Sequence, residues 1–248
     1  MIDHDDLAIN HCGKTYKIAL RRNPRATRFT LRIRAATQEV VLTAPTRSRL
    51  ADIRKFASEH AEWIHSKLTL VPKTVPFQHG SIVPVRGIDH QIVHLRTERG
   101  LVSLERPKAD SLPQRPFFLY VFGHEEHVER RTSDFLKTLA KADIRLAVKK
   151  HCSMLNIQPP PVTIRDTVSR WGSCSSTGGL NFSWRLIFAP AFILDYLAAH
   201  EVAHIREMNH SKRFWGIVEA LCPETHSAEK WLDEHGASLH RYGARRKI

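Results

Sequence analysis

The chain has 248 residues, of which 42% are hydrophobic, so it can bury a core in one large domain or in two modest ones. No apolar run approaches the ~20 residues of a membrane helix, and the acidic opening MIDHDDLAIN is unlike a signal peptide. With 38 Lys and Arg residues against 25 Asp and Glu residues, the formal charge of +13 attracts polyanions, either nucleic acid or an acidic protein substrate.

The four cysteines are widely separated and form no CxxC pair. This spacing argues against a zinc knuckle and against a dense disulfide framework, and it is typical of a reducing compartment. We therefore expect a cytoplasmic protein with no membrane partner.

Residues 1–105 predict a β-rich, basic N-terminal domain with one helix. FTLRIR at 29–34 and EVVLTAP at 39–45 suit one hairpin, and SIVPVRG at 81–87 with HQIVHL at 90–95 suits another. Between them, apolar residues at helical spacing predict a single helix over 48–68, with Ser48 as its N-cap.

Alternation in the first of these strands predicts a basic surface, because successive side chains of a strand point to opposite faces. The residues expected to face the core are Phe29, Leu31 and Ile33, and those expected on the solvated face are Arg28, Arg32 and Arg34. Such a face can meet phosphates, but no aromatic residues for base stacking are interleaved with the arginines. A plain solvated surface is the alternative.

The polar, proline-rich run at 105–116 predicts a linker and a domain boundary between residues 105 and 106. The second domain, 106–248, opens with helical periodicity over 117–155. Short strands at 162–166, 169–174 and 179–189 follow, with Gly178-Gly179 as a turn, and helices at 191–208, 211–222 and 228–240 end the chain, the last capped by Ser227. The fold class is α+β, with a small antiparallel sheet in the C-terminal domain.

The run HEVAHIREMNH, residues 200–210, contains the most specific chemical signal in the chain. His200 and His204 are four apart, so on a helix they project from one face and can reach a single ion. Glu201 can then lie beside a metal-activated water and accept its proton. This is the zincin motif HExxH, and the apolar helix upstream makes two unpaired histidines costly to bury without a metal.

A tetrahedral catalytic zinc needs a third protein ligand, for which we prefer His210. The helix must turn before it, and Asn209 in a left-handed conformation followed by Ser211 as the next N-cap provide the means. The spacing equals that of metzincins, but Glu207 replaces their glycine. The competing third ligands are Glu219, Glu224 and Glu229.

Several segments spread over nearly the whole chain carry a family resemblance: RRNPRATRFTLRIR, EWIHSKL, RWGSCSS, NFSWRLIFAP, HEVAH and MNHSKRFW. In these segments and in their order, the chain resembles the YgjP-like family of zinc metallopeptidases, which are zincins related to the SprT-like proteases. The resemblance implies a zincin-like C-terminal domain. It also implies Zn²⁺ held by His200, His204 and His210, with Glu201 as the catalytic base.

The segment before the motif, SRWGSCSSTGGLNFSWRLI, is the candidate substrate-binding strand. In zincins an extended peptide pairs with the edge strand beside the active-site helix. Arg170 can stabilise an oxyanion or hold a substrate carboxylate, and Trp171 can form a wall of the cleft. Asn181 is the third candidate, although each of the three also has a purely structural explanation.

The leading interpretation is a zinc metallopeptidase, a hydrolase in which metal-activated water attacks the peptide carbonyl with Glu201 as general base. The alternatives are a nucleic-acid-associated basic binding protein with a structural zinc, and a SprT-like protease that acts on DNA-bound proteins. Structural zinc usually has four protein ligands, so three histidines favour catalysis.

Overall fold

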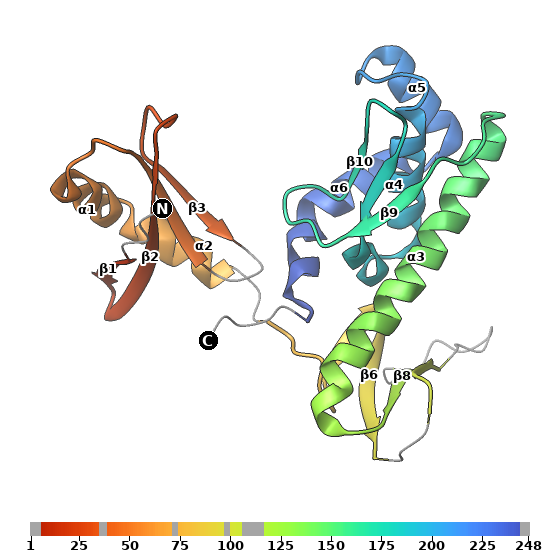
Figure 1. The fold of residues 1–248 in the computed structure, drawn as a ribbon, viewed down its shortest axis with the longest axis horizontal. Helices are drawn as coiled ribbons and strands as arrows, with labels where there is room; N and C mark the ends of the chain where they lie inside the picture. Colours follow the sequence, from red (N-terminus) through yellow and green to blue (C-terminus); the bar gives the residue numbers. More distant parts are fainter. Residues whose placement is uncertain (1–5, 35–38, 71–73, 97–99, 106–116, 244–248) are drawn as a thin grey trace. The chain divides into compact units, whose positions relative to one another are not determined.

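The computed structural model describes residues 6–34, 39–70, 74–96, 100–105 and 117–243, and it has the predicted α+β fold (Figure 1). Contacts within the chain divide it into two compact units, whose described residues lie within 6–74 and 75–243. Each unit has its own hydrophobic core. No helix in the described part of the chain combines the length and the apolar composition that crossing a membrane requires.

The first unit is a four-stranded sheet with two helices. The strand order is β1-β2-β4-β3, with β2 and β4 parallel and the two outer pairs antiparallel. The predicted β3–β4 hairpin is confirmed, whereas the β1–β2 hairpin was not anticipated. The elements are β1 (Asp6–His11), β2 (Lys14–Asn23), β3 (Thr30–Arg34), β4 (Glu39–Pro45), α1 (Leu50–Glu59) and α2 (Ala61–Leu70).

The single helix predicted for this unit is wrong, because the chain is interrupted at His60 and forms α1 and α2 instead. Ser48 is not its cap, since α1 begins after Arg49 without a side-chain hydrogen bond. The alternation in β3 is confirmed for the described side chains: Leu31 and Ile33 pack against the core, and Arg32 is exposed. The side chain of Arg34 lies outside the described part.

The second unit begins with another four-stranded sheet. Its order, β5-β6-β8-β7, and its strand directions repeat the pattern of the first sheet. The predicted β5–β6 hairpin is confirmed. The elements are β5 (Ile82–Val85), β6 (Ile88–Leu95), β7 (Ser103–Leu104) and β8 (Phe117–Phe122).

The helix predicted from residue 117 is wrong in its first part, where strand β8 stands instead. The side chains of β8 alternate between buried and half-buried, and its aromatic and β-branched residues suit a sheet. Gly123, at φ +103°, follows the strand. A short 3-10 turn, η1 (Glu125–His127), then leads into the long helix α3 (Val128–Met154).

The boundary between the two compact units falls between residues 74 and 75 of the sequence, which differs from the boundary expected at 105–106. The reason is the parallel pairing of β6 with β8 across the proline-rich connection. That connection therefore joins two strands of one sheet. Residues 106–116 of the predicted linker lie outside the described residues.

A third, small sheet supports the site. Its order is β10-β11-β9, with β10 and β11 antiparallel and β9 parallel to β11, so the sheet is mixed rather than antiparallel as expected. The predicted turn between β10 and β11 is confirmed, with Gly178 at φ +82°. The elements are β9 (Val162–Arg165), β10 (Gly172–Cys174), β11 (Leu180–Ser183) and the 3-10 segment η2 (Trp184–Phe188).

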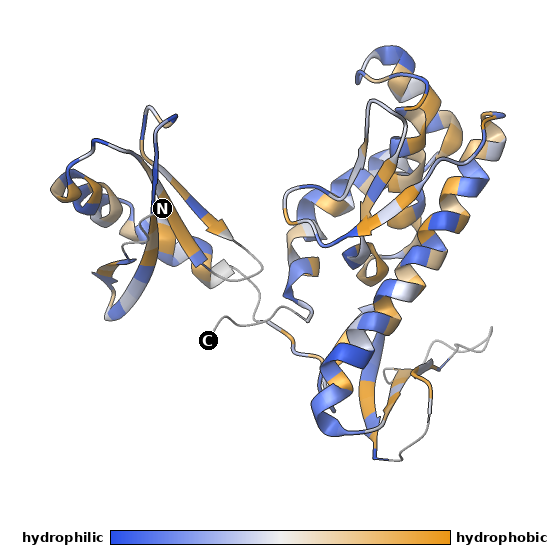
Figure 2. Cartoon of the chain, in the orientation of Figure 1, coloured by the Kyte–Doolittle hydropathy of each residue, from blue (hydrophilic) through white to orange (hydrophobic). Residues whose placement is uncertain are grey.

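Helix α4 (Ala191–Ala203) is the central element of this unit, because it is buried along most of its length. It packs against α3, whose ribbon in Figure 2 is coloured largely as hydrophilic. Three further elements follow: α5 (Lys212–Leu221), α6 (Thr225–His235) and η3 (Gly236–Arg241). Ser227 does not cap α6, which begins two residues earlier, at Thr225.

Candidate metal centre

The last turn of α4 presents the two histidines of the motif. His204 and Glu201 are buried and His200 is half-buried, so the apolar helix carries three polar side chains into the unit's interior. His204 stands directly after the last helical residue and still donates its amide to the carbonyl of His200. The helix therefore delivers both imidazoles to one place, where the chain leaves the core.

The chain turns sharply after Ala203. The amides of Ile205 and Arg206 donate to the carbonyls three residues earlier, those of Val202 and Ala203, and the α-helix ends at Ala203, five residues before the predicted end at Met208. Asn209 does not adopt the left-handed conformation, so that prediction is wrong. The predicted cap of α5 is confirmed, since the Ser211 hydroxyl accepts from the Phe214 amide at 3.3 Å.

The turn brings His210 back to the two helical histidines. The three imidazoles offer ligand atoms that all lie within 4.8 Å of one another, and the Nε2 atoms of His200 and His210 are 3.2 Å apart. Two imidazole nitrogens on a tetrahedral zinc lie roughly 3.3 Å apart, given Zn–N bonds of about 2.0–2.1 Å. The buried ring of Phe214 packs against all three imidazoles. This arrangement fits a metal ion.

Further hydrogen bonds orient two of the rings. The Nδ1 atom of His204 lies 3.2 Å from the Glu207 carbonyl oxygen, which favours a proton on Nδ1 and leaves Nε2 for a metal. The Nδ1 atom of His200 lies 3.4 Å from the Tyr196 hydroxyl, which donates to Glu229 at 3.2 Å. Glu229 thus contacts Tyr196, and the cluster of potential ligands found in the described residues contains none of the three alternative glutamates.

Glu201 differs from the exposed acids of the chain. Its Oε2 atom is buried without a hydrogen-bond partner among the described residues. Burial raises the pKa of Glu201 to about 7, although the charge of Arg170 and the backbone amide of Cys174 oppose this shift. Burial and the two neighbouring histidines lower the pKa of His200 to about 4. The ring is therefore neutral near pH 7, as a metal ligand must be.

Gly172 makes room for Glu201. A Cβ atom at this position would lie 2.4 Å from Oε1 of Glu201, closer than side chains can approach. Only glycine therefore lets strand β10 pass so near to the carboxylate. We did not single out this residue in the sequence, although a glycine inside a strand often marks such a close approach.

The structure gathers the three predicted substrate-binding residues around one surface cavity of about 250 Å³. Its lining includes Arg165, Thr167, Arg170, Trp171, Ser173 and Asn181. Asn181 accepts a hydrogen bond from Arg165 at 2.9 Å. Because it is paired with Ser173, it lies on the opposite face of the sheet from Gly172 and Cys174, the face away from Glu201.

Trp171 has a packing role as well. Its ring stacks on His240 at 4.8 Å between centroids. The buried Arg185 links the same region, because it donates to Asp166 at 2.6 Å and to the Tyr242 carbonyl at 2.7 Å. These contacts tie the segment before β10, which carries Arg170, to the C-terminal η3.

A comparison with known protein families finds a metallopeptidase domain. A family model described as "YgjP-like, metallopeptidase domain" matches residues 27–235, most of the chain. Among solved structures, the metallopeptidase zymogen of Pyrococcus abyssi abylysin matches with 24% identity and a TM-score of 0.35, over 40% of this chain and 97% of that one. No curated protein matches. The predicted nucleic-acid partner gains no support from the matching family.

The first prediction concerns the link from Tyr196 to His200. Tyr196→Phe removes the hydroxyl that contacts Nδ1, so we expect zinc affinity to fall by about 10- to 100-fold, measured by competition with a chelator. Tyr120→Phe, on strand β8, is the matched control and should leave the affinity unchanged. Equal affinity in both variants would show that Tyr196 does not orient His200.

Proposed function

Because the chain belongs to the YgjP-like metallopeptidase domain family, as its residues predicted, we propose that it is a zinc-dependent peptidase whose site is built on α4 and β10. The observation that carries the proposal is the convergence of three imidazoles beside a buried glutamate that has an unpartnered oxygen. Hydrolysis of a peptide bond needs these two components next to each other.

In this proposal His200, His204 and His210 hold the metal. When bound, Zn²⁺ supplies Lewis acidity, which polarises a carbonyl and lowers the pKa of water to about 7. The chain contributes the orientation of the rings through Glu207 and Tyr196, and an apolar floor through Phe214. The HExxH arrangement favours zinc over iron or manganese, although imidazole binds several first-row metals.

Glu201 performs the proton transfers. It lies between His200 and His204 in the sequence and on the same buried helix as His200. Strand β10 passes close to its carboxylate at Gly172. Its carboxylate accepts the proton of the attacking water and passes it to the departing amine. Water is the nucleophile, so no covalent intermediate forms with the protein.

The peptide substrate would lie along β10. This strand is at the edge of its sheet, and the backbone of an edge strand can pair with an extended peptide. Of the three predicted substrate-binding residues, Arg170 is the one whose charge acts on Glu201, because it lowers the pKa of that carboxyl. It can stabilise the oxyanion or, together with Arg165, hold a carboxylate of the substrate in the cavity.

A nucleic-acid-binding function is not part of the proposal. The basic residues Arg28 and Arg32 are exposed, which a solvated surface explains equally well. The cytoplasmic location inferred from the cysteines stays a prediction.

The second prediction tests the general base. Glu201→Gln keeps the shape of the side chain but cannot accept a proton, so hydrolysis of an unfolded protein substrate should fall by at least about 100-fold. Zinc content should stay at the level of the unmodified chain. Glu219→Gln, an exposed residue on α5, is the matched control and should keep full activity. Hydrolysis retained by Glu201→Gln would exclude Glu201 as the base.

The third prediction concerns Gly172. Gly172→Ala places a methyl group against Oε1, Cδ and Cγ of the Glu201 side chain, so this side chain must move, while the fold and the metal should be kept. A shift of about 1 Å costs roughly 100-fold in rate, which should appear in kcat/KM. Gly216→Ala on α5 adds its methyl group to open space and serves as the control. Normal activity in Gly172→Ala would mean that the position of Glu201 does not depend on this glycine.

A further inference from the structure

The first unit contains a second cluster of potential metal-binding side chains, which the proposed peptidase site does not use. His11, Cys12 and Glu62 offer ligand atoms that all lie within 4.8 Å of one another. We propose that these three residues bind a transition-metal ion of the zinc type. The inference goes beyond the proposed function, because all three residues lie within residues 6–74, in the other compact unit.

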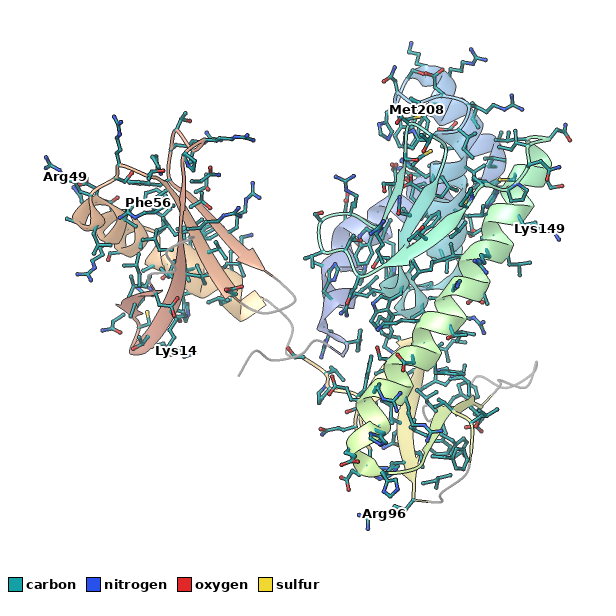
Figure 3. The ribbon with its side chains drawn as sticks, viewed as in Figure 1. Lys14, Arg49, Phe56, Arg96, Lys149 and Met208 are labelled. Carbon is teal, nitrogen blue, oxygen red and sulfur yellow. The ribbon has the colours of Figure 1, made fainter. Side chains whose placement is uncertain are left out.

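The β1–β2 hairpin fixes two of the ligands. His11 is the last residue of β1 and is paired with Lys14, the residue labelled at this hairpin in Figure 3. The two turn residues are Cys12 and Gly13, at φ +48° and +72°. Turns with two such residues prefer Asn-Gly or Asp-Gly, so a cysteine in the first position is unusual and costs stability. The turn holds the thiol next to the His11 ring.

Helix α2 supplies the third ligand. Oε2 of Glu62 lies 2.7 Å from Nε2 of His11, a hydrogen bond in which the ring donates to the carboxylate. A metal ion on Nε2 would require the ring proton to move to Nδ1, and the Cys12 thiol would release its proton to water. His65 lies one turn further on the same helix face, with its ring 5.8 Å from that of His11. Its Nδ1 atom is in contact with the Tyr16 hydroxyl at 2.5 Å.

The donor set selects the kind of ion. One nitrogen, one sulfur and one oxygen suit Zn²⁺ or Co²⁺, whereas a thiolate disfavours Mg²⁺ and Ca²⁺. The three side chains are exposed or half-exposed, so they can close around an ion without disturbing the core. A bound ion would join the hairpin turn to α2 more strongly than the hydrogen bond between His11 and Glu62 does alone. Three protein ligands leave one position for water.

The experiment uses Co²⁺ as the probe, because a thiolate ligand gives cobalt a charge-transfer absorption in the near ultraviolet that imidazole and carboxylate ligands do not give. The full chain is titrated in a His204→Ala background, which removes one imidazole of the candidate peptidase site. We expect the band to saturate at about one cobalt ion per chain.

Cys12→Asn in the same background is the decisive variant. Asparagine is favoured in this turn, so the hairpin should persist, and the thermal unfolding midpoint should not fall. The band should be lost. Cys174→Ser, which removes the thiol near Glu201, is the matched control and should keep the band. Absence of the band in the His204→Ala chain, or its survival in Cys12→Asn, would overturn the proposal. Either result leaves the peptidase proposal untouched.

Discussion

The burial of α4 is the constraint on which the rest of the site depends. This helix is apolar along its length and packs against α3, η2, α5 and α6, so its position and rotation are fixed by the core. The helix places Glu201 in that core, where the loss of water destabilises the charged form of its carboxyl group. His200 and His204 lie on either side of Glu201 in the sequence and share another face of the helix. Two of the three candidate ligands and the candidate base therefore take their positions from one well-packed helix, and only His210 depends on the segment that follows it.

The remaining parts are arranged around this helix with short-range chemistry. The turn after Ala203 brings His210 against His200. Ser211 caps the start of α5, and the ring of Phe214 on this helix packs against the imidazoles. Strand β10 approaches from the other direction, which its glycine makes possible. The edge of a small sheet, a buried carboxylate and three imidazoles therefore meet at one place, although Gly172 on the strand and His210 are more than 30 residues apart in sequence.

Local features around the candidate site were predicted from the sequence better than the architecture was. The spacing of His200 and His204 predicts their shared face because helix geometry is local, and the cap at Ser211 is equally local. The parallel pairing of β6 with β8 depends on distant segments, so the boundary expected at 105–106 could not be corrected from pattern alone. Strand β8 was mistaken for helix because a short apolar run fits both periods. The role of Gly172 depends on which side chain approaches it, and only the fold determines that.

The most direct test of the account is the zinc content of the chain and of a His210→Ala variant, both carrying Cys12→Asn so that only the three-histidine cluster contributes. Mass spectrometry of the two proteins, purified identically, should find about one zinc per chain in the first and almost none in the second, because two imidazoles hold zinc too weakly. Equal zinc in both would contradict the account, since the third ligand would then not be His210, and absence of zinc from both would remove the metal centre altogether.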